Sequence, residues 1–66
     1  MINFEFNRFI IHFNDGKDLS FDRKGNTYIY DDHIEVKIKV APSIVDRTFI
    51  CKSDIRYFEL IEEFED

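Results

Sequence analysis

The sequence predicts an α+β protein with a small, mostly antiparallel sheet or β-roll of five to six short strands, closed by one C-terminal amphipathic helix. Three observations predict this fold. Apolar and charged residues alternate from Ile34 to Val40, turn-forming pairs such as Asp15-Gly16 separate several β-rich segments, and residues 53–66 space their apolar side chains as a helix does. We expect one domain, with a strand-rich body at 1–52 and an acidic helix at 53–66.

The N-terminal segment, residues 2–14, fits both regular structures. As a strand it places apolar side chains at even positions up to Phe6 and at odd positions from Phe9, so a bulge or turn is needed at Asn7-Arg8. As a helix it gathers its apolar residues on one side. Its Phe, Ile and Asn content and the hairpin signal Asp15-Gly16 favour the strand, and the helix stays an alternative.

The next segments are short. Leu19 and Phe21 alternate with polar residues and predict a return strand. A turn is expected at 23–26, where Gly25 and Asn26 are free to adopt positive φ. Residues 27–30 have high β-propensity and predict another strand.

The segment 34–40 is the clearest strand, because its strict alternation predicts one buried and one solvated face. Pro42 ends it, and a loop follows that carries Ile44 and Val45, either on the core or exposed for a partner. Residues 47–52 predict a further strand, antiparallel to 34–40 in the simplest arrangement.

The C-terminal segment is expected to start its helix at Ser53 or Asp54, since either side chain can cap the first turn. At helical spacing, one side of this segment is apolar and faces the core. That side consists of Tyr57, Phe58, Leu60, Ile61 and Phe64. The opposite side is an acidic ridge of Glu59, Glu62, Glu63 and Asp66.

The net charge of −5 lies entirely in residues 54–66, which hold six acids and one base, whereas residues 1–53 are neutral. Most of these acids crowd the C-terminal end of the expected helix, where the helix dipole disfavours anions. Helix stability does not explain that placement. A docking surface for a basic patch would, and a plain solvated face is the alternative. The predicted partner-binding residues are Tyr57, Phe58, Glu59, Glu62, Glu63 and Asp66.

A second possible surface combines Lys37 and Lys39 with Tyr28 and Tyr30, since bases and aromatic rings on one sheet face can hold single strands. Ordinary sheet surface is the blander interpretation. The acidic balance of the chain makes nucleic acid an unlikely partner overall.

No catalytic or metal-binding motif is present. Asp31, Asp32, His33 and Glu35 match no metal-loop spacing and indicate a polar turn. Cys51, the only cysteine, is expected to be a small buried side chain, although a Cys–His pair with a histidine stays open. We therefore expect no catalytic residues, no metal and no cofactor.

These features predict a non-enzymatic protein-binding module. The most concrete version is a small phage or mobile-element protein that inhibits or redirects a host protein, including one that itself binds nucleic acid, by occupying its basic surface. One alternative is a homo-oligomeric assembly module, and another is a weak single-strand binder. A single cysteine and the lack of a signal-like or membrane-spanning segment predict a cytoplasmic protein with no membrane contact.

Overall fold

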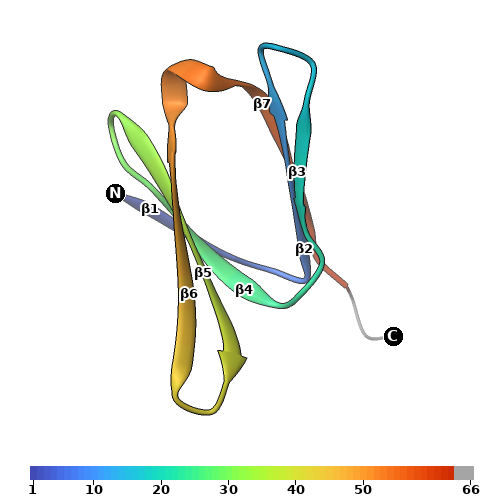
Figure 1. The fold of residues 1–66 in the computed structure, drawn as a ribbon, viewed down its shortest axis with the longest axis vertical. Coiled ribbons are helices and arrows are strands. Elements are labelled where there is room, and N and C mark those ends of the chain that lie inside the picture. The colour runs from blue at the N-terminus through green and yellow to red at the C-terminus, as the bar shows by residue number, and fades with distance from the viewer. Residues whose placement is uncertain (64–66) are drawn as a thin grey trace.

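The computed structural model describes residues 1–63 and forms two antiparallel sheets (Figure 1). A four-stranded sheet has the order β1-β4-β5-β6, and a three-stranded sheet has the order β3-β2-β7. The elements are β1 (Ile2–Phe6), β2 (Arg8–Phe13), β3 (Asp18–Phe21), β4 (Gly25–Ile29), β5 (His33–Ala41), β6 (Ile44–Cys51), the 3-10 helix η1 (Lys52–Asp54) and β7 (Ile55–Ile61).

The prediction of a C-terminal helix, and with it the α+β class, is wrong: the described chain is nearly all β. Ile55–Ile61 is strand β7, antiparallel to β2. In that register Phe58 lies opposite Ile11 and Leu60 opposite Phe9, so alternation, and not a helical stripe, places these side chains on the core side of β7. Both are only partly covered there. The edge of β2 forms the backbone hydrogen bonds that β7 needs. The apolar spacing of this segment fits both a helix and a strand, and the pairing with β2 selects the strand.

The predicted cap residues have another role. Ser53 and Asp54 lie in η1, and their carbonyl oxygens accept hydrogen bonds from Asn14, whose side-chain Nδ2 donates over 2.8 Å and whose backbone N–H donates over 2.9 Å. These bonds fasten η1 to the β2–β3 hairpin. The chain can therefore cross from β6 in one sheet to β7 in the other.

The N-terminal segment is confirmed as strand, with its break at Asn7. The backbone N–H of Asn7 donates to the carbonyl of Ile61 over 2.9 Å, and its side-chain Oδ1 accepts from the N–H of Glu63 over 2.9 Å. The parity change in the sequence therefore marks the point where the chain leaves one sheet and enters the other. The two residues that flank this break, Phe6 and Phe9, are both almost fully buried, whereas Ile2 and Phe4 at the start of β1 are exposed.

Glycine is required at two positions for different reasons. Gly16 has φ +88° in the β2–β3 turn, as the hairpin prediction requires. Gly25 was expected in a turn with positive φ, and this was wrong, because it starts β4. A Cβ there would lie 2.6 Å from the carbonyl oxygen of Lys37 and 3.0 Å from the Phe6 ring, so Gly25 is needed for close approach.

The core lies between the two sheets. Its buried side chains are Phe6, Phe9, Ile11, Ile34, Val36, Ile38 and Ile50. The ring of Phe9 is central, with its centroid 5.2 Å from that of Phe6 and 5.4 Å from that of Phe58. The antiparallel pairing of β5 with β6 is confirmed, and Ile34, Val36 and Ile38 are buried as the alternation predicts. The expectation was wrong at two positions, because Val40 is 38% exposed and Glu35 on the other face is covered. Ile44 and Val45 begin β6 instead of forming a loop.

Candidate functional site

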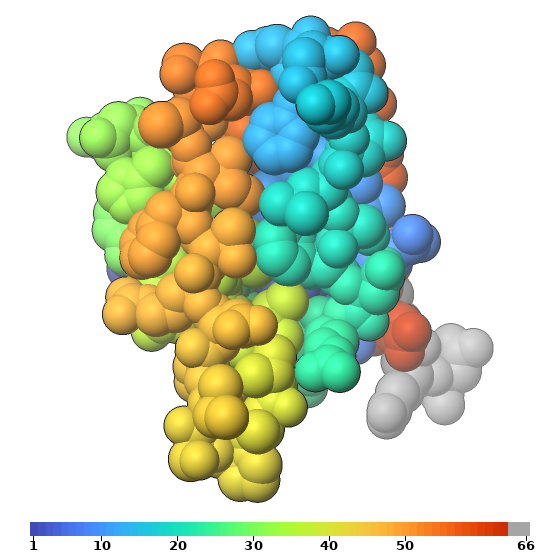
Figure 2. Space-filling model, viewed as in Figure 1, coloured from blue at the N-terminus to red at the C-terminus, as the bar shows by residue number. Residues whose placement is uncertain are grey.

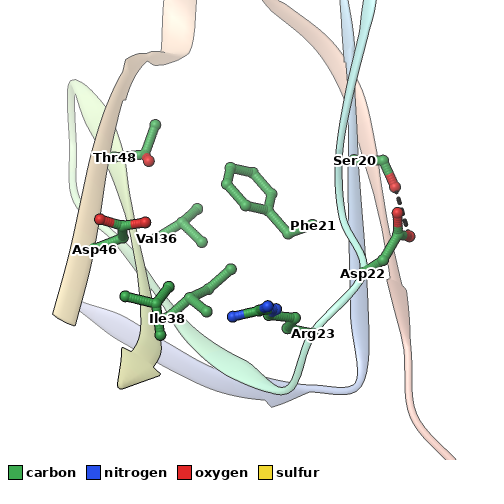
Figure 3. A pocket seen from close by; sticks show the side chains of 9 residues that line it. Ser20, Phe21, Asp22, Arg23, Val36, Ile38, Asp46 and Thr48 are labelled. Atoms are coloured by element: carbon green, nitrogen blue, oxygen red, sulfur yellow. Dashed lines mark hydrogen bonds between the residues drawn. The ribbon is translucent and has the colours of Figure 1, made fainter. Parts of the chain in front are cut away.

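A groove separates β3 from β6, the edge strands of the two sheets, on the face shown in Figure 2. Its volume is about 610 Å³. Phe21 points into the groove opposite Val36 and Ile38, while Asp46 and Thr48 line it from β6 (Figure 3). Arg23, two residues after the end of β3, lines the same groove. An apolar interior with charged margins is the usual make-up of a protein-binding surface.

Both strands that border this groove have an unpaired edge. Within residues 1–63, β3 pairs only with β2 and β6 pairs only with β5. Much of β6 is exposed, including the large apolar side chains of Ile44, Val45 and Phe49. A long exposed edge strand with apolar side chains is a template for pairing with another chain.

The outer face of the four-stranded sheet carries bases and aromatic rings on strands β4 to β6; we call it the aromatic–basic face. Alternation brings these side chains to the face opposite the core. Lys37 Nζ lies 5.3 Å from the centroid of the Tyr28 ring, and Arg47 Cζ lies 5.6 Å from that of Phe49. The face consists of Tyr28, Tyr30, His33, Lys37, Lys39, Arg47 and Phe49.

One acid lies beneath this face. Glu35 is only 4% exposed and lies directly across from Tyr28 on one side and Phe49 on the other. Arg47 Nε donates to its Oε1 over 2.8 Å. That hydrogen bond lowers the pKa of Glu35 and raises the pKa of Arg47. Glu35 is therefore ionised at neutral pH, paired, and covered from solvent.

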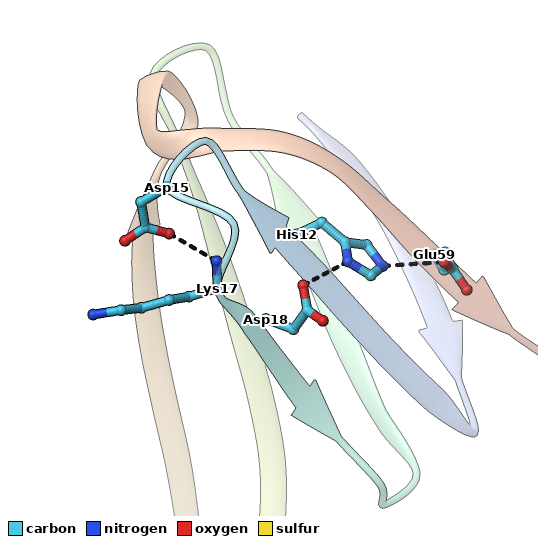
Figure 4. A network of polar contacts seen from close by, with 5 residues as sticks. All are labelled: His12, Asp15, Lys17, Asp18 and Glu59. Atoms are coloured by element: carbon cyan, nitrogen blue, oxygen red, sulfur yellow. Dashed lines mark hydrogen bonds and ion pairs between the residues drawn. The ribbon is translucent and has the colours of Figure 1, made fainter.

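The outer face of the three-stranded sheet holds a different network, centred on His12 (Figure 4). His12 Nδ1 lies 2.7 Å from an oxygen of Asp18, and His12 Nε2 lies 3.0 Å from an oxygen of Glu59. The imidazole also stacks on Tyr57, with 4.2 Å between ring centroids. The imidazole is thus held in place by two carboxylates and one aromatic ring.

The predicted partner-binding residues are spread over several places. Tyr57 and Glu59 lie on the outer face of the three-stranded sheet, whereas Phe58 packs inward against Phe9. Glu62 and Glu63 follow β7, near Glu5 and Lys24. Asp66 lies outside the described residues. The stripe and ridge expected of a helix are therefore not formed, and a binding role for these residues stays a prediction.

The cysteine is exposed, so the expectation of a buried Cys51 was wrong. It lies directly across from His33 in the β5–β6 register, but His33 stacks on Tyr30 at 4.5 Å and contacts Asp32 through Nδ1 over 2.6 Å. The hydrogen bond with His33 lowers the pKa of Asp32. In the part of the chain that the structure describes, no hydrogen bond joins Cys51 to a histidine, and no three His, Cys, Asp or Glu side chains could hold a metal ion.

Two surface residues were missed from the sequence, Arg47 and Phe49. The signal was available, because the strand predicted at 47–52 pairs with 34–40, and alternation then places Arg47 and Phe49 on the face of Lys37 and Lys39. Phe49 is 60% exposed, more than the other exposed phenylalanines of the described chain, Phe4 and Phe58, at 39% and 36%.

Comparison with protein-family models, with curated proteins and with solved structures finds no match for this chain. Among the residues that the structure describes, no helix is long and apolar enough to cross a bilayer.

Proposed function

We propose that this protein is a non-enzymatic binding module that accepts an extended segment of another protein at the β6 edge and acts by occupying that partner. The observation that carries the proposal is the apolar groove between two unpaired edge strands. Strand addition of this kind takes its affinity from backbone hydrogen bonds and its specificity from pockets for alternate side chains.

The groove indicates what such a segment contains. A strand added beside β6 would turn every second side chain inward over Val36, Ile38 and Phe21, so apolar residues are expected at those positions. Asp46 lies on the same inner face of β6 and would attract a lysine or arginine. A basic segment thus agrees with the partner expected from the sequence, although it meets the molecule at the groove instead of on a helix.

The biological setting is part of the proposal. A single, exposed cysteine suits a reducing compartment such as the cytoplasm. A small binding domain is suited to inhibiting or redirecting a larger protein, as expected of a phage or mobile-element product. Pairing of two copies through β6 is the competing outcome, because Ile44 and Val45 are half exposed and would be covered in a dimer.

The test uses a displayed library of random peptides of about ten residues, the upper length of an ordinary strand. Peptides selected on the folded protein should alternate apolar with polar residues and carry a base. When they are titrated into labelled protein, amide NMR shifts should concentrate in β6 and β3. Asp46→Lys should weaken binding at least about tenfold, since it places like charges together.

The matched control is Asp31→Lys, which makes the same charge change in an exposed turn away from the groove and should leave binding unchanged. Selected peptides that shift Tyr57 and Glu59 instead would move the contact to the acidic side and overturn the groove proposal. Shifts in β6 that depend on protein concentration without peptide would replace it with a homodimer.

A further inference from the structure

The aromatic–basic face lies outside the groove and has a chemistry of its own. Its cations, Lys37, Lys39 and Arg47, lie on neighbouring strands, and its rings come from all three strands β4 to β6. The groove proposal uses the inner side and the edge of β6. The outer face is left without a role by that proposal, although Phe49 is mostly exposed there.

The charge that this face presents to solvent is positive. Within strands β4 to β6 the one acid on this face is Glu35, which is covered and paired with Arg47. Asp32, in the turn before β5, contacts His33 at the end of the face, away from Lys37 and Lys39. At the margin Glu5 of β1 is balanced by Lys24, and both line a hollow of about 310 Å³ together with Lys37 and Lys39. A protein with a net charge of −5 thus has a local cationic surface, because its acids lie elsewhere.

The face places cations beside aromatic rings, and a nucleic-acid strand likewise places phosphates beside bases. Lys37 lies over Tyr28 and Arg47 over Phe49, so each ring has a cation next to it. Tyr30 and His33 add two further rings, which stack on each other with an angle of 14° between their planes. Single-stranded nucleic acid is bound by this combination, with bases stacked on rings and phosphates held by the neighbouring cations.

We propose that the aromatic–basic face binds single-stranded nucleic acid. Complementary charge favours a polyanion, and the rings favour one whose bases are unpaired, since a duplex keeps its bases stacked on one another. Because Arg47 is paired with Glu35, Lys37 and Lys39 are the cations left to meet phosphates, and log K should fall with log salt at a slope of about −1.4. The face thus predicts weak binding without base specificity.

The probe for the test is a fluorescein-labelled oligothymidine of about ten nucleotides, within the site size of small sheet-based binders. Its anisotropy is measured against protein concentration at salt between about 50 mM and 200 mM. The double variant Lys37→Gln/Lys39→Gln should weaken binding about tenfold at the lower salt and bring the slope close to zero, because the remaining cation, Arg47, is paired with Glu35.

The charge-matched control is Arg8→Gln/Arg56→Gln. It also removes two positive charges, but outside the aromatic–basic face: Arg8 is paired with Asp22, and Arg56 lies over Tyr57 of the three-stranded sheet. This control should retain the wild-type affinity and slope. A second pair separates stacking from charge: Phe49→Ala should weaken binding at least about fivefold, whereas Tyr57→Ala should not.

Several outcomes would overturn the proposal. One is the absence of an anisotropy change at low salt, and another is equal weakening by the two arginine substitutions. Equal affinity for a duplex of the same length would indicate general charge attraction. Displacement of the oligothymidine by an oligoglutamate peptide as readily as by unlabelled oligothymidine would identify an acidic-peptide site. None of these outcomes bears on Asp46 and the groove, so the two proposals fail independently.

Discussion

The outer faces of the two sheets are built by the same alternation of side chains. One face places bases around a central acid, and the other places acids around a central histidine. On the four-stranded sheet a covered acid, Glu35, is held by Arg47 among aromatic rings and lysines. On the three-stranded sheet a partly covered base, His12, is held between the carboxylates of Asp18 and Glu59. Exposed bases thus surround the acid of one network, and exposed carboxylates flank the imidazole of the other.

This difference shows that the net charge describes neither face. Most acids of the described chain lie in the turns, in η1 and after β7, and the exposed charges that strands β4 to β6 carry on the aromatic–basic face are basic. An argument that excludes polyanionic ligands from a net charge of −5 averages two surfaces that a ligand would meet separately. Substitutions in the core that both sheets share, and then in each sheet alone, test whether the two faces are independent.

The largest effect is expected from Phe9→Ala, because the Phe9 ring supports both faces from the core. It contacts Phe6 of the first sheet and Phe21 and Phe58 of the second. Removing a buried Phe side chain costs about 3–5 kcal/mol, and a domain of this size has little stability to spare. The free energy of unfolding, measured by urea titration with circular dichroism, should fall by that amount or the variant should be unfolded.

Phe49→Ala is the matched control, since the same substitution at a side chain that is 60% exposed leaves no internal cavity. Its cost should stay below about 1 kcal/mol. An equal loss in both variants would mean that Phe49 is part of the core and not of a surface.

An intermediate effect is expected from Gly25→Ala, which acts on the four-stranded sheet. The new Cβ would meet the Lys37 carbonyl at 2.6 Å, and backbone in a strand cannot move aside as a flexible side chain can. Overpacking of this kind costs about 1–3 kcal/mol. In amide hydrogen exchange, β4 and β5 should lose protection before β2 and β7.

Gly16→Ala serves as the comparison in the other sheet. Nothing lies within 4 Å of its Cβ position, so the only cost is that of φ +88°, about 1–2 kcal/mol. Its loss of protection should be confined to the β2–β3 hairpin. Equal loss across both sheets in either variant would show that the sheets unfold as one unit.

Much of the strand pattern was available from the sequence. The alternation of β5, the Asp15-Gly16 turn and the parity change at Asn7 each fix a local structure with few alternatives, and the structure confirms all three, except for Val40 and Glu35 of β5. Gly25 was misplaced for a different reason. A glycine in a strand signals close packing as well as a turn, and only the neighbouring strands reveal which of the two applies.

The C-terminal segment was misassigned because its apolar residues satisfy both periods. The crowding of acids at the C-terminal end of the expected helix conflicted with the helix dipole. That conflict was interpreted as a sign of function, whereas it was evidence against the helix. In strand β7 the dipole conflict does not arise, because a strand has little net dipole, and Glu59 simply faces His12.

The groove could not be predicted from the strands alone. It exists because β3 and β6, which are separated by two other strands in the chain, are the edges that approach each other without pairing. Which edges meet depends on sheet order, and sheet order depends on long-range pairing of the kind that joins β7 to β2. The aromatic–basic face, in contrast, needed only the β4–β5 and β5–β6 registers, each between strands that are neighbours in the chain.

The smallest effect, and the one that most directly compares the faces, comes from removing one carboxylate from each network. Glu35→Gln should lower the melting temperature at pH 7 by several degrees, because the covered amide loses its charge-assisted bond with Arg47. Glu59→Gln should cost less than about 1 kcal/mol, since its side chain is 50% exposed and its contact with His12 is screened by water.

The pH dependence distinguishes the two further. The hydrogen bond from Arg47 lowers the pKa of Glu35 in the folded protein, so the unfolded chain takes up a proton first as the pH falls. Its stabilising contribution is fully present above the unfolded pKa of a glutamate, about 4.3, and is lost as the pH falls through the lower folded value. The melting temperatures of wild type and Glu35→Gln should therefore converge in acid. A difference in melting temperature that stays constant down to pH values below that range would contradict this. It would mean that the substituted amide destabilises the fold by its shape alone, and that the charge of Glu35 contributes nothing to the aromatic–basic face.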